Sequence, residues 1–365
     1  ANGSARCALE RGQADRAPLS AKDIDGILAD QSEAGAPARR EIASALGFAS
    51  GGHPLLMSFR RLLKDSDSQV RKRTISSAAL LKRREYIPDL LRLLAQSKLR
   101  SSITDSLVSY GSIILGALRD TLVDSQTDIL VRSHLPRIIA LIGGPEARQT
   151  LLSQVSINDI SLRYSVIKAL GTLRRREPEL GFDETFVREV LKSEAREYYL
   201  LTAHILAQTA VNGQREGAEF LVRTLKDRRR LRVEQIFRLS GLIYPQQDMV
   251  RAFYGLTSAS SSLRAGAIEF LDTIWIHSEN ELLFGILEGK NIIVVGKLLG
   301  IPAFNRDDSI KELLAGSDNW LAACAANVVK EELLAGHGVK LKERSSSSYR
   351  ALSETAQSAL DAVGA

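Results

Sequence analysis

The amino-acid sequence predicts an all-α fold in which antiparallel helix pairs stack side by side into an α-solenoid. Three observations support this prediction. Apolar residues recur with the period of a helix, the alternation typical of strands is nearly absent, and an apolar–arginine pair recurs every 29 to 36 residues. The arginines of these pairs are Arg39, Arg71, Arg100, Arg132, Arg163, Arg196, Arg232 and Arg264.

The first full repeat shows how one pair is built. Its first helix has an apolar face made of Leu55, Leu56, Phe59, Leu62 and Leu63. The turn "KDSDSQ" follows, and within it Ser66 and Gln69 have the spacing of a capping box, which predicts the start of the second helix. That helix presents small and branched residues to its neighbour, namely Val70, Ile75, Ala78, Ala79 and Leu81.

Later segments follow the same pattern. Pro136 predicts a kink or a late helix start within residues 131–142, because proline lacks an amide donor and clashes with the preceding turn. The run Gly143-Gly144-Pro145 predicts the end of one helix and the start of the next. A further helix over residues 263–274 is expected to bury one stripe, formed by Leu263, Ala267, Phe270, Leu271 and Ile274. A degenerate copy of the repeat covers residues 317–334.

A single helix pair cannot bury its apolar face, so each pair must pack on the next. Burial of each large aliphatic side chain contributes roughly 1.5–3 kcal/mol, which lets stacking replace a compact core. We therefore expect three regions: a linker or N-terminal cap over residues 1–30, the solenoid over 31–335, and a Ser-rich linker with a C-terminal helix over 336–365.

Composition narrows the class of protein. The 365 residues carry a formal net charge of +6, which permits an anionic partner without requiring one. The two cysteines, Cys7 and Cys324, cannot form a disulfide framework or a four-cysteine zinc site, and they fit a reducing compartment. No uninterrupted apolar run reaches the roughly 18–20 residues that span a bilayer, and the start of the sequence has the composition of a linker.

The sequence offers no residue set typical of an enzyme, a metal site or a cofactor site. The five histidines, His53, His134, His204, His277 and His337, lack the i, i+4 spacing of a helical zinc pair, and no phosphate-binding loop is present. Cys324 lies among alanines and is predicted to be a core residue. Glu269 and Asp272 could act as paired carboxylates, but helix caps and links to Arg264 are the favoured interpretation.

Three basic clusters are the candidate binding residues for an anionic partner: Lys82, Arg83 and Arg84; Arg174, Arg175 and Arg176; and Arg228, Arg229 and Arg230. The first two are predicted to end equivalent helices, where cations complement the negative helix terminus. The alternative is that the clusters line one edge and bind phosphates or a membrane. Stacking on bases would require interleaved aromatic residues, and the aromatic content is only 5%.

A turn ending in aspartate, then "VR", then a helix of small apolar residues resembles the HEAT repeat, in particular the short bacterial type of the phycobilin-lyase kind. The resemblance implies a ladder of hydrogen bonds along the stack, with Asp67, Arg71, Arg100, Arg132, Arg163 and Arg264 in it and a direct bond between Asp67 and Arg71.

Longer stretches, such as "VRSHLPRIIALIGGPEARQTLL" at 131–152 and "LRYSVIKALGTLR" at 162–174, resemble the helical half of bacterial fusion proteins. In those fusions, a transporter of the ADP/ATP translocase or major-facilitator type precedes the HEAT repeats. The similarity covers roughly residues 54–335. It implies a location at the cytoplasmic face of the bacterial plasma membrane and a covalently linked membrane domain.

From these features we expect a non-catalytic interaction or regulatory module that binds a protein partner and needs no cofactor or metal. The first alternative is a nucleic-acid-binding solenoid similar to the HEAT-like DNA glycosylases. A remote alternative is an enzyme similar to the bilin lyases.

Overall fold

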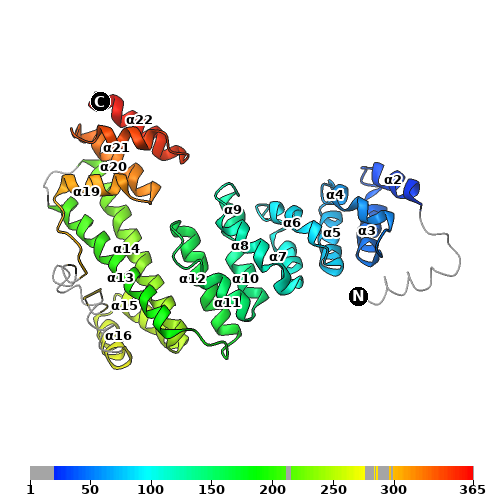
Figure 1. Ribbon diagram of the computed structural model, residues 1–365, viewed down its shortest axis with the longest axis horizontal. Helices are drawn as coiled ribbons and strands as arrows, with labels where there is room; N and C mark the ends of the chain where they lie inside the picture. Colours follow the sequence, from blue (N-terminus) through cyan, green and yellow to red (C-terminus); the bar gives the residue numbers. More distant parts are fainter. Residues whose placement is uncertain are drawn as a thin grey trace. The chain divides into compact units, whose positions relative to one another are not determined.

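The computed structural model describes residues 20–210, 215–275 and 299–364, together with Leu283, Gly285, Ile286 and Gly296. Every regular element in this described part is helical, which confirms the all-α prediction (Figure 1). Within it, no helix has both the length and the apolar character needed to cross a membrane. The chain divides into two compact units, Ala1–Ile142 and Gly143–Ala365, where the sequence predicted one continuous solenoid.

The N-terminal unit is a succession of short helices and 3-10 turns. The helices α3, α5, α7 and α10 pack on one another in chain order, and the short helices lie between them in sequence. Of the predicted first-helix stripe, Leu55, Phe59, Leu62 and Leu63 are buried and Leu56 is half-buried. The elements are α2 (Ala21–Ala29), α3 (Ala36–Ala45), η2 (Leu46–Phe48), η3 (Pro54–Ser58), α4 (Phe59–Leu62), α5 (Ser68–Leu81), η4 (Arg84–Tyr86), α6 (Ile87–Leu93), α7 (Arg100–Ser109), η5 (Gly111–Ile114), α8 (Leu115–Val123), α9 (Ile129–Arg132) and α10 (Leu135–Ile142).

The start of α5 differs from the predicted capping box. The N-cap is Asp67, whose carboxylate accepts hydrogen bonds from the amides of Gln69 and Val70 at 2.7 and 2.9 Å. Ser66 lies one residue before the cap, so the prediction was wrong by one position. The physical reason is that the neighbouring aspartate supplies a charged acceptor to the same orphan amides.

The expectations at Pro136 and at the glycine pair are confirmed. The helix that contains Pro136 starts late, because α9 ends at Arg132 and α10 begins at Leu135. Gly143 adopts a φ of 79° and is the N-cap of α11, in which Pro145 occupies the first turn. The Glu177 carboxylate accepts a hydrogen bond of 3.0 Å from the Gly144 amide. This satisfies one of the backbone N–H groups that have no partner within the helix at its start.

The C-terminal unit departs most from the predicted repeat. Two long helices, α13 and α14, pack along each other, and α14 also contacts α12, α15 and α20 (Figure 1). The pairs Ala195-Arg196 and Leu231-Arg232, expected after turns, lie in the middle of these continuous helices. Its elements are α11 (Gly144–Leu152), α12 (Ile160–Arg176), α13 (Glu184–Thr209), α14 (Glu216–Ile243), α15 (Gln246–Thr257), α16 (Ser261–Ile274), α19 (Arg306–Ala315), α20 (Asn319–Glu332), α21 (Gly338–Ser345) and α22 (Arg350–Val363).

The predicted stripe of α16 is only partly buried. Ala267 and Leu271 lie in the core, whereas Leu263 is 60% exposed and Phe270 36% exposed, so these two predictions were wrong. Helical spacing identifies a face. It does not tell how much of that face a neighbouring helix covers.

The C-terminal end of the chain is packed. The degenerate repeat at 317–334 forms α20, and α22 and α21 lie over α20 and α19, respectively, with α21 and α22 also packing together. The Ser-rich run expected as a linker is the end of α21 and the turn before α22, and the expected C-terminal helix is present. The Arg344 guanidinium joins this region to α19, because it donates to the carbonyls of Leu314, Ala315 and Gly316. Residues 1–19 of the expected N-terminal linker lie outside the described part, and α2 occupies the rest.

Candidate functional site: a groove in the N-terminal unit

Three of the recurring arginines donate to backbone carbonyls, two at the end of the preceding helix and one in the loop that follows it. Arg100 donates to the Leu94 carbonyl at 3.1 Å, and Arg132 to the Leu122 carbonyl at 2.8 Å. Arg163 donates to the Ile157 carbonyl at 2.9 Å. The carbonyls of Leu94 and Leu122 have no partner inside their own helix, and a cation also complements the negative helix terminus there. Arg100, Arg132 and Arg163 therefore have structural roles, and each makes a hydrogen bond from its side chain to the backbone.

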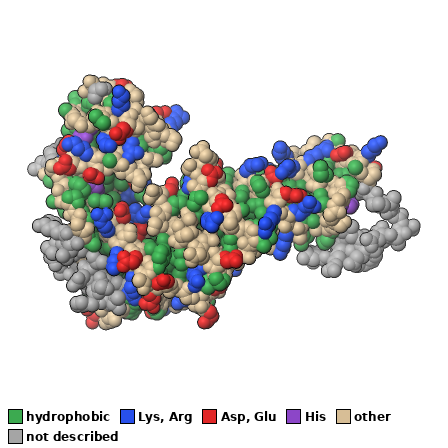
Figure 2. All heavy atoms as spheres, viewed as in Figure 1, with side chains coloured by type: hydrophobic (Ala, Val, Ile, Leu, Met, Phe, Trp, Pro, Cys, Tyr) green, Lys and Arg blue, Asp and Glu red, His purple; other side chains and the backbone are tan. Residues whose placement is uncertain are grey.

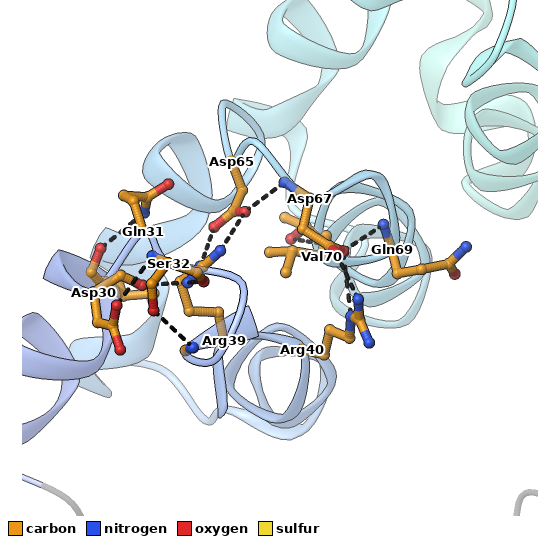
Figure 3. Close-up of polar contacts among 12 residues, drawn as sticks. Asp30, Gln31, Ser32, Arg39, Arg40, Asp65, Asp67, Gln69 and Val70 are labelled. Carbon is orange, nitrogen blue, oxygen red and sulfur yellow. Dashed lines mark hydrogen bonds and ion pairs between the residues drawn. The ribbon is translucent and has the colours of Figure 1, made fainter. Parts of the chain in front are cut away.

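The implied bond between Asp67 and Arg71 is absent. Asp67 instead forms an ion pair of 2.5 Å with Arg40, one repeat earlier, and this hydrogen-bonded guanidinium, with the amides of Val70 and Gln69, holds the pKa of Asp67 well below its usual range (Figure 3). The Nε of Arg71 is buried without a hydrogen-bond partner. The next turn, residues 95–98, reads "AQSK" and offers Arg71 no carboxylate. Arg264 is exposed on α16, so its expected place in the ladder finds no support.

Figure 3 also shows a second ion pair beside the first. Arg39 is 1% exposed and contacts Asp65 through two hydrogen bonds of 2.7 and 3.2 Å. The same guanidinium donates to the carbonyls of Asp30 and Ser32, and the Asp65 carboxylate accepts the Asp67 amide at 2.9 Å. All the charged groups of this cluster are matched, so it holds two repeats together and leaves no charge for a ligand.

A comparable cluster lies inside the C-terminal unit. Glu194 is 2% exposed and lies between Arg163 and Arg232, with oxygen–nitrogen distances of 3.2 and 2.7 Å. Arg232 also donates to Gln235 at 3.2 Å. A cavity of about 160 Å³ adjoins this cluster and is bordered by Arg228 as well. Arg163 of α12 and Arg232 of α14 thus share one buried carboxylate.

The three basic clusters differ in what their side chains do. Lys82 is the exposed C-cap of α5, Arg83 pairs with Glu85 at 2.8 Å, and Arg84 is exposed. Within the second cluster, at the end of α12 as predicted, the Arg174 guanidinium donates to the Pro178 carbonyl.

The third cluster lies in the middle of α14 and is partly used within the protein. Arg228 forms an ion pair of 2.8 Å with Asp318, and Arg229 lies over the ring of Tyr198. Arg230 is exposed.

The other candidate residues occupy structural positions. Cys324 is 5% exposed, and burial raises the pKa of its thiol, which confirms the core prediction. Glu269 and Asp272 are exposed on α16. His53 caps η3, whereas the buried His204 ring stacks on Phe304.

The structure also shows the surroundings of two of the three remaining histidines. The buried His337 ring lies 2.9 Å from the Asp307 carboxylate, and His134 is half-buried. His277 lies outside the described residues. Among the residues that the structure describes, no three His, Cys, Asp or Glu side chains come together as a metal site would require.

Among the described residues, a candidate binding feature is a groove of about 850 Å³ in the N-terminal unit. One wall is α6 with the residues that flank it, and the other is η5 and α8, with the turn to α9 at one end. Its apolar lining includes Ile87, Leu91 and Val131, and small residues widen it at Ala95, Gly116 and Ala117. The volume lies in the range of ligand-binding clefts. Of the predicted candidates, only Arg84 lies in this groove.

Sequence reasoning missed the groove because its signal is weak. Leu91 and Ile87 read as ordinary core positions, and they are indeed almost buried at 7% and 5% exposure. The available signal was the pair Gly116-Ala117 within a helix, since small residues permit close approach of another backbone. A single sequence does not tell whether that backbone belongs to the same chain.

The basic excess of the protein is concentrated in this unit. Residues 20–142 contain 18 Lys and Arg against 13 Asp and Glu, whereas residues 143–365 contain 28 of each. Figure 2 shows the Lys and Arg side chains spread over the surface of the N-terminal unit. An acidic segment would therefore be attracted to the unit that contains the groove.

Comparison with known proteins adds no assignment: no protein-family model matches the chain, and a search of curated proteins gave no match. The resemblance of the sequence to transporter–HEAT fusions is therefore the basis of a proposal only.

Proposed function

We propose that this protein is a non-catalytic interaction module, and that its N-terminal unit holds a segment of a protein partner in the groove between α6 and α8. The observation that carries this proposal is the groove itself, with its apolar floor and charged rims. Grooves of this kind bind peptides through a few apolar anchors, while polar rim groups set orientation. Binding requires no chemistry from the protein.

The repeated packing of α3, α5, α7 and α10 supports a second part of the proposal, a HEAT-like solenoid arrangement in the N-terminal unit. Hydrogen bonds recur at the same step: Ser77 donates to the Ala43 carbonyl at 2.6 Å, and Ser109 to the Ala79 carbonyl at 3.2 Å. Equivalent contacts one repeat apart are typical of stacked repeats.

We also propose a cellular setting for this module. On the sequence resemblance over residues 54–335, it serves as a regulatory part of a transporter of the ADP/ATP translocase or major-facilitator type, at the cytoplasmic face of the membrane. The partner segment then belongs to that transporter or to a protein that controls it. Sequencing the complete gene tests this setting, because a preceding transporter domain would contribute about twelve hydrophobic spans, and an encoded chain without them would contradict it.

The binding proposal is tested by selecting helical peptides from a display library against the full chain. We expect selected peptides to slow hydrogen exchange in residues 84–95 and 113–131, because these segments line the groove. Gly116→Trp should abolish binding, since a side chain at this position meets open space in the groove. The matched control is Gly26→Trp on α2, where a side chain also meets open space. Peptides that bind both variants equally, or that protect other segments, would contradict the proposal.

A further inference from the structure

The shape of the groove identifies the kind of segment that fits it. On the α6 side, the lining residues are Arg84 in η4, then Ile87, Pro88, Leu91 and Arg92 on one face of α6, and Ala95 in the turn that follows. On the opposite side they lie at 113, 116, 117, 120 and 121, again one helical face. The seven residues of α6 span about 10 Å, so contact along α6 requires a partner helix of at least two turns.

Small residues make room for a third helix between these two faces. Ala95 on one side and Gly116 and Ala117 on the other leave space along the middle of the groove. At Gly116, an added Cβ would meet no atom within 4 Å. A helix with an apolar stripe could therefore pack on Ile113, which is 50% exposed, and on the exposed edges of Ile87 and Leu91, with its backbone close to α8.

The two rims of the groove carry opposite charge. Arg84 and Arg92 lie eight residues apart on the α6 side, Asp120 lies on α8 opposite them, and Asp128, the N-cap of α9, lies in the turn at one end of the groove. Arg92 is 76% exposed in its ion pair with Asp89, and the Asp120 pair with Arg119 is exposed on both sides. Exposed ion pairs contribute about 0–1 kcal/mol, so these groups can exchange partners at little cost.

We propose that the occupant is an amphipathic helix that carries carboxylates along one flank of its apolar stripe and cations along the other. The carboxylates face Arg84 and Arg92, and the cations face Asp120 and Asp128. A nucleic-acid backbone fits this groove poorly, because it would place phosphates against the acidic rim as well. This inference rests on the proposed function, whose groove it uses.

Three synthetic peptides of about 18 residues test the proposal by fluorescence anisotropy with the full chain. All share one leucine and alanine stripe. The first has glutamates on one flank and lysines on the other, the second glutamates on both, and the third lysines on both. We expect the first peptide to bind at least tenfold more tightly than the other two. Equal affinity of the three, or tightest binding of the all-lysine or all-glutamate peptide, would overturn the proposal.

A charge-reversed variant provides a second test of the proposed charge pattern. The double variant Arg84→Glu and Arg92→Glu makes both rims acidic, so the all-lysine peptide should become the tightest ligand. An unchanged order of affinities would contradict the charge assignment. Circular dichroism checks that the variant retains its helices.

The Gly116→Trp variant distinguishes failure of the groove as the binding site from failure of the inferred charge pattern. If Gly116→Trp abolishes binding while the charge reversal leaves the order unchanged, the groove is the site and only the inferred charge pattern fails. If the peptides bind Gly116→Trp as they bind the unaltered chain, or if none binds, the proposed function fails too. Duplex DNA that competes with the first peptide at about 150 mM salt would likewise overturn the inferred occupant.

Discussion

Arg39 and Asp65 form a pair whose charges are both removed from water. Arg39 also holds two backbone carbonyls, so the guanidinium replaces most of its hydration with protein groups. The exposed pair Arg61–Asp25 in the same unit has no such burial, with side chains 45% and 73% exposed. The two pairs therefore differ in burial while sharing the same chemistry.

From this difference we predict that Asp65→Asn lowers the free energy of unfolding by about 3–5 kcal/mol, because it leaves a buried guanidinium without its counter-charge. Asp25→Asn, the exposed control, should cost no more than about 1 kcal/mol. Urea unfolding followed by circular dichroism measures both. Similar losses in the two variants would refute the distinction.

His204 predicts a dependence of stability on pH. Burial lowers the pKa of His204 to about 4, from an unfolded value of about 6.5. The neutral ring stacks on Phe304 and forms a hydrogen bond of 3.0 Å with Ser309. Because the folded pKa is depressed, this contribution is complete above about pH 6.5 and is lost as the pH falls towards 4.

We therefore expect the stability difference between the native chain and His204→Gln to shrink by roughly 3 kcal/mol between pH 7 and pH 4. Thermal melts of both proteins across this pH range measure the difference. The glutamine variant serves as its own control for carboxylates elsewhere, which titrate in both proteins. Parallel pH profiles would show that His204 does not titrate as its burial requires.

At the scale of elements, α16 shows how one helix divides between core and solvent. Leu271 is fully buried, whereas Leu263, eight residues earlier on the predicted stripe, is largely exposed. The same substitution at the two positions thus reports on burial alone.

We predict that Leu271→Asp costs several kcal/mol, on the order of 4, because it places an unpaired charge in the core. Leu263→Asp and Arg175→Ala should each change the free energy of unfolding by less than about 1 kcal/mol. Differential scanning fluorimetry ranks the three variants. Equal thermal shifts for Leu271→Asp and Leu263→Asp would be inconsistent with this packing.

The continuity of α14 is a second property of an element. The sequence predicted a turn before Leu231, whereas the helix runs from Glu216 to Ile243. The segment "KDRRRLRVEQ" contains no glycine or proline, and most of its residues favour helix. An apolar–arginine pair is compatible with the middle of a helix as well as its start, so the repeat pattern alone could not place the boundary.

Arg230→Pro tests this continuity. In the middle of a helix, proline removes a hydrogen bond and clashes with the preceding turn, so we expect a loss of at least about 3 kcal/mol. Arg230→Ala keeps the helix and should leave the unfolding midpoint nearly unchanged, since Arg230 is exposed. A turn at this position would tolerate the proline, and a small effect would support the repeat boundary predicted from sequence.

At the scale of the whole chain, charge is divided unequally between the units. The N-terminal unit has the basic excess, whereas the C-terminal unit has equal numbers of acidic and basic residues. Net charge therefore favours attraction of nucleic acid to the N-terminal unit, where the acidic residues oppose it in part.

We predict that duplex or single-stranded DNA is retained in a gel shift only at low salt, about 50 mM, and released at about 150 mM, because non-specific phosphate contacts weaken steeply with salt. Retention at nanomolar protein concentration and 150 mM salt would favour the nucleic-acid alternative over a protein partner. Arg84→Glu with Arg92→Glu provides the control for contacts made at the groove.

The sequence by itself determined the helical class, the late helix start at Pro136 and the start of α5 to within one residue of its N-cap. These properties depend on residues close together in the chain, where helical period, turn formers and caps act locally. Only the tertiary structure decided that Arg40 is the partner of Asp67, that α13 and α14 run unbroken, that Leu263 is exposed, and that α6 and α8 leave a groove between them. Each of these depends on which residues, distant in the sequence, lie opposite a given side chain. Packing between helices decides that.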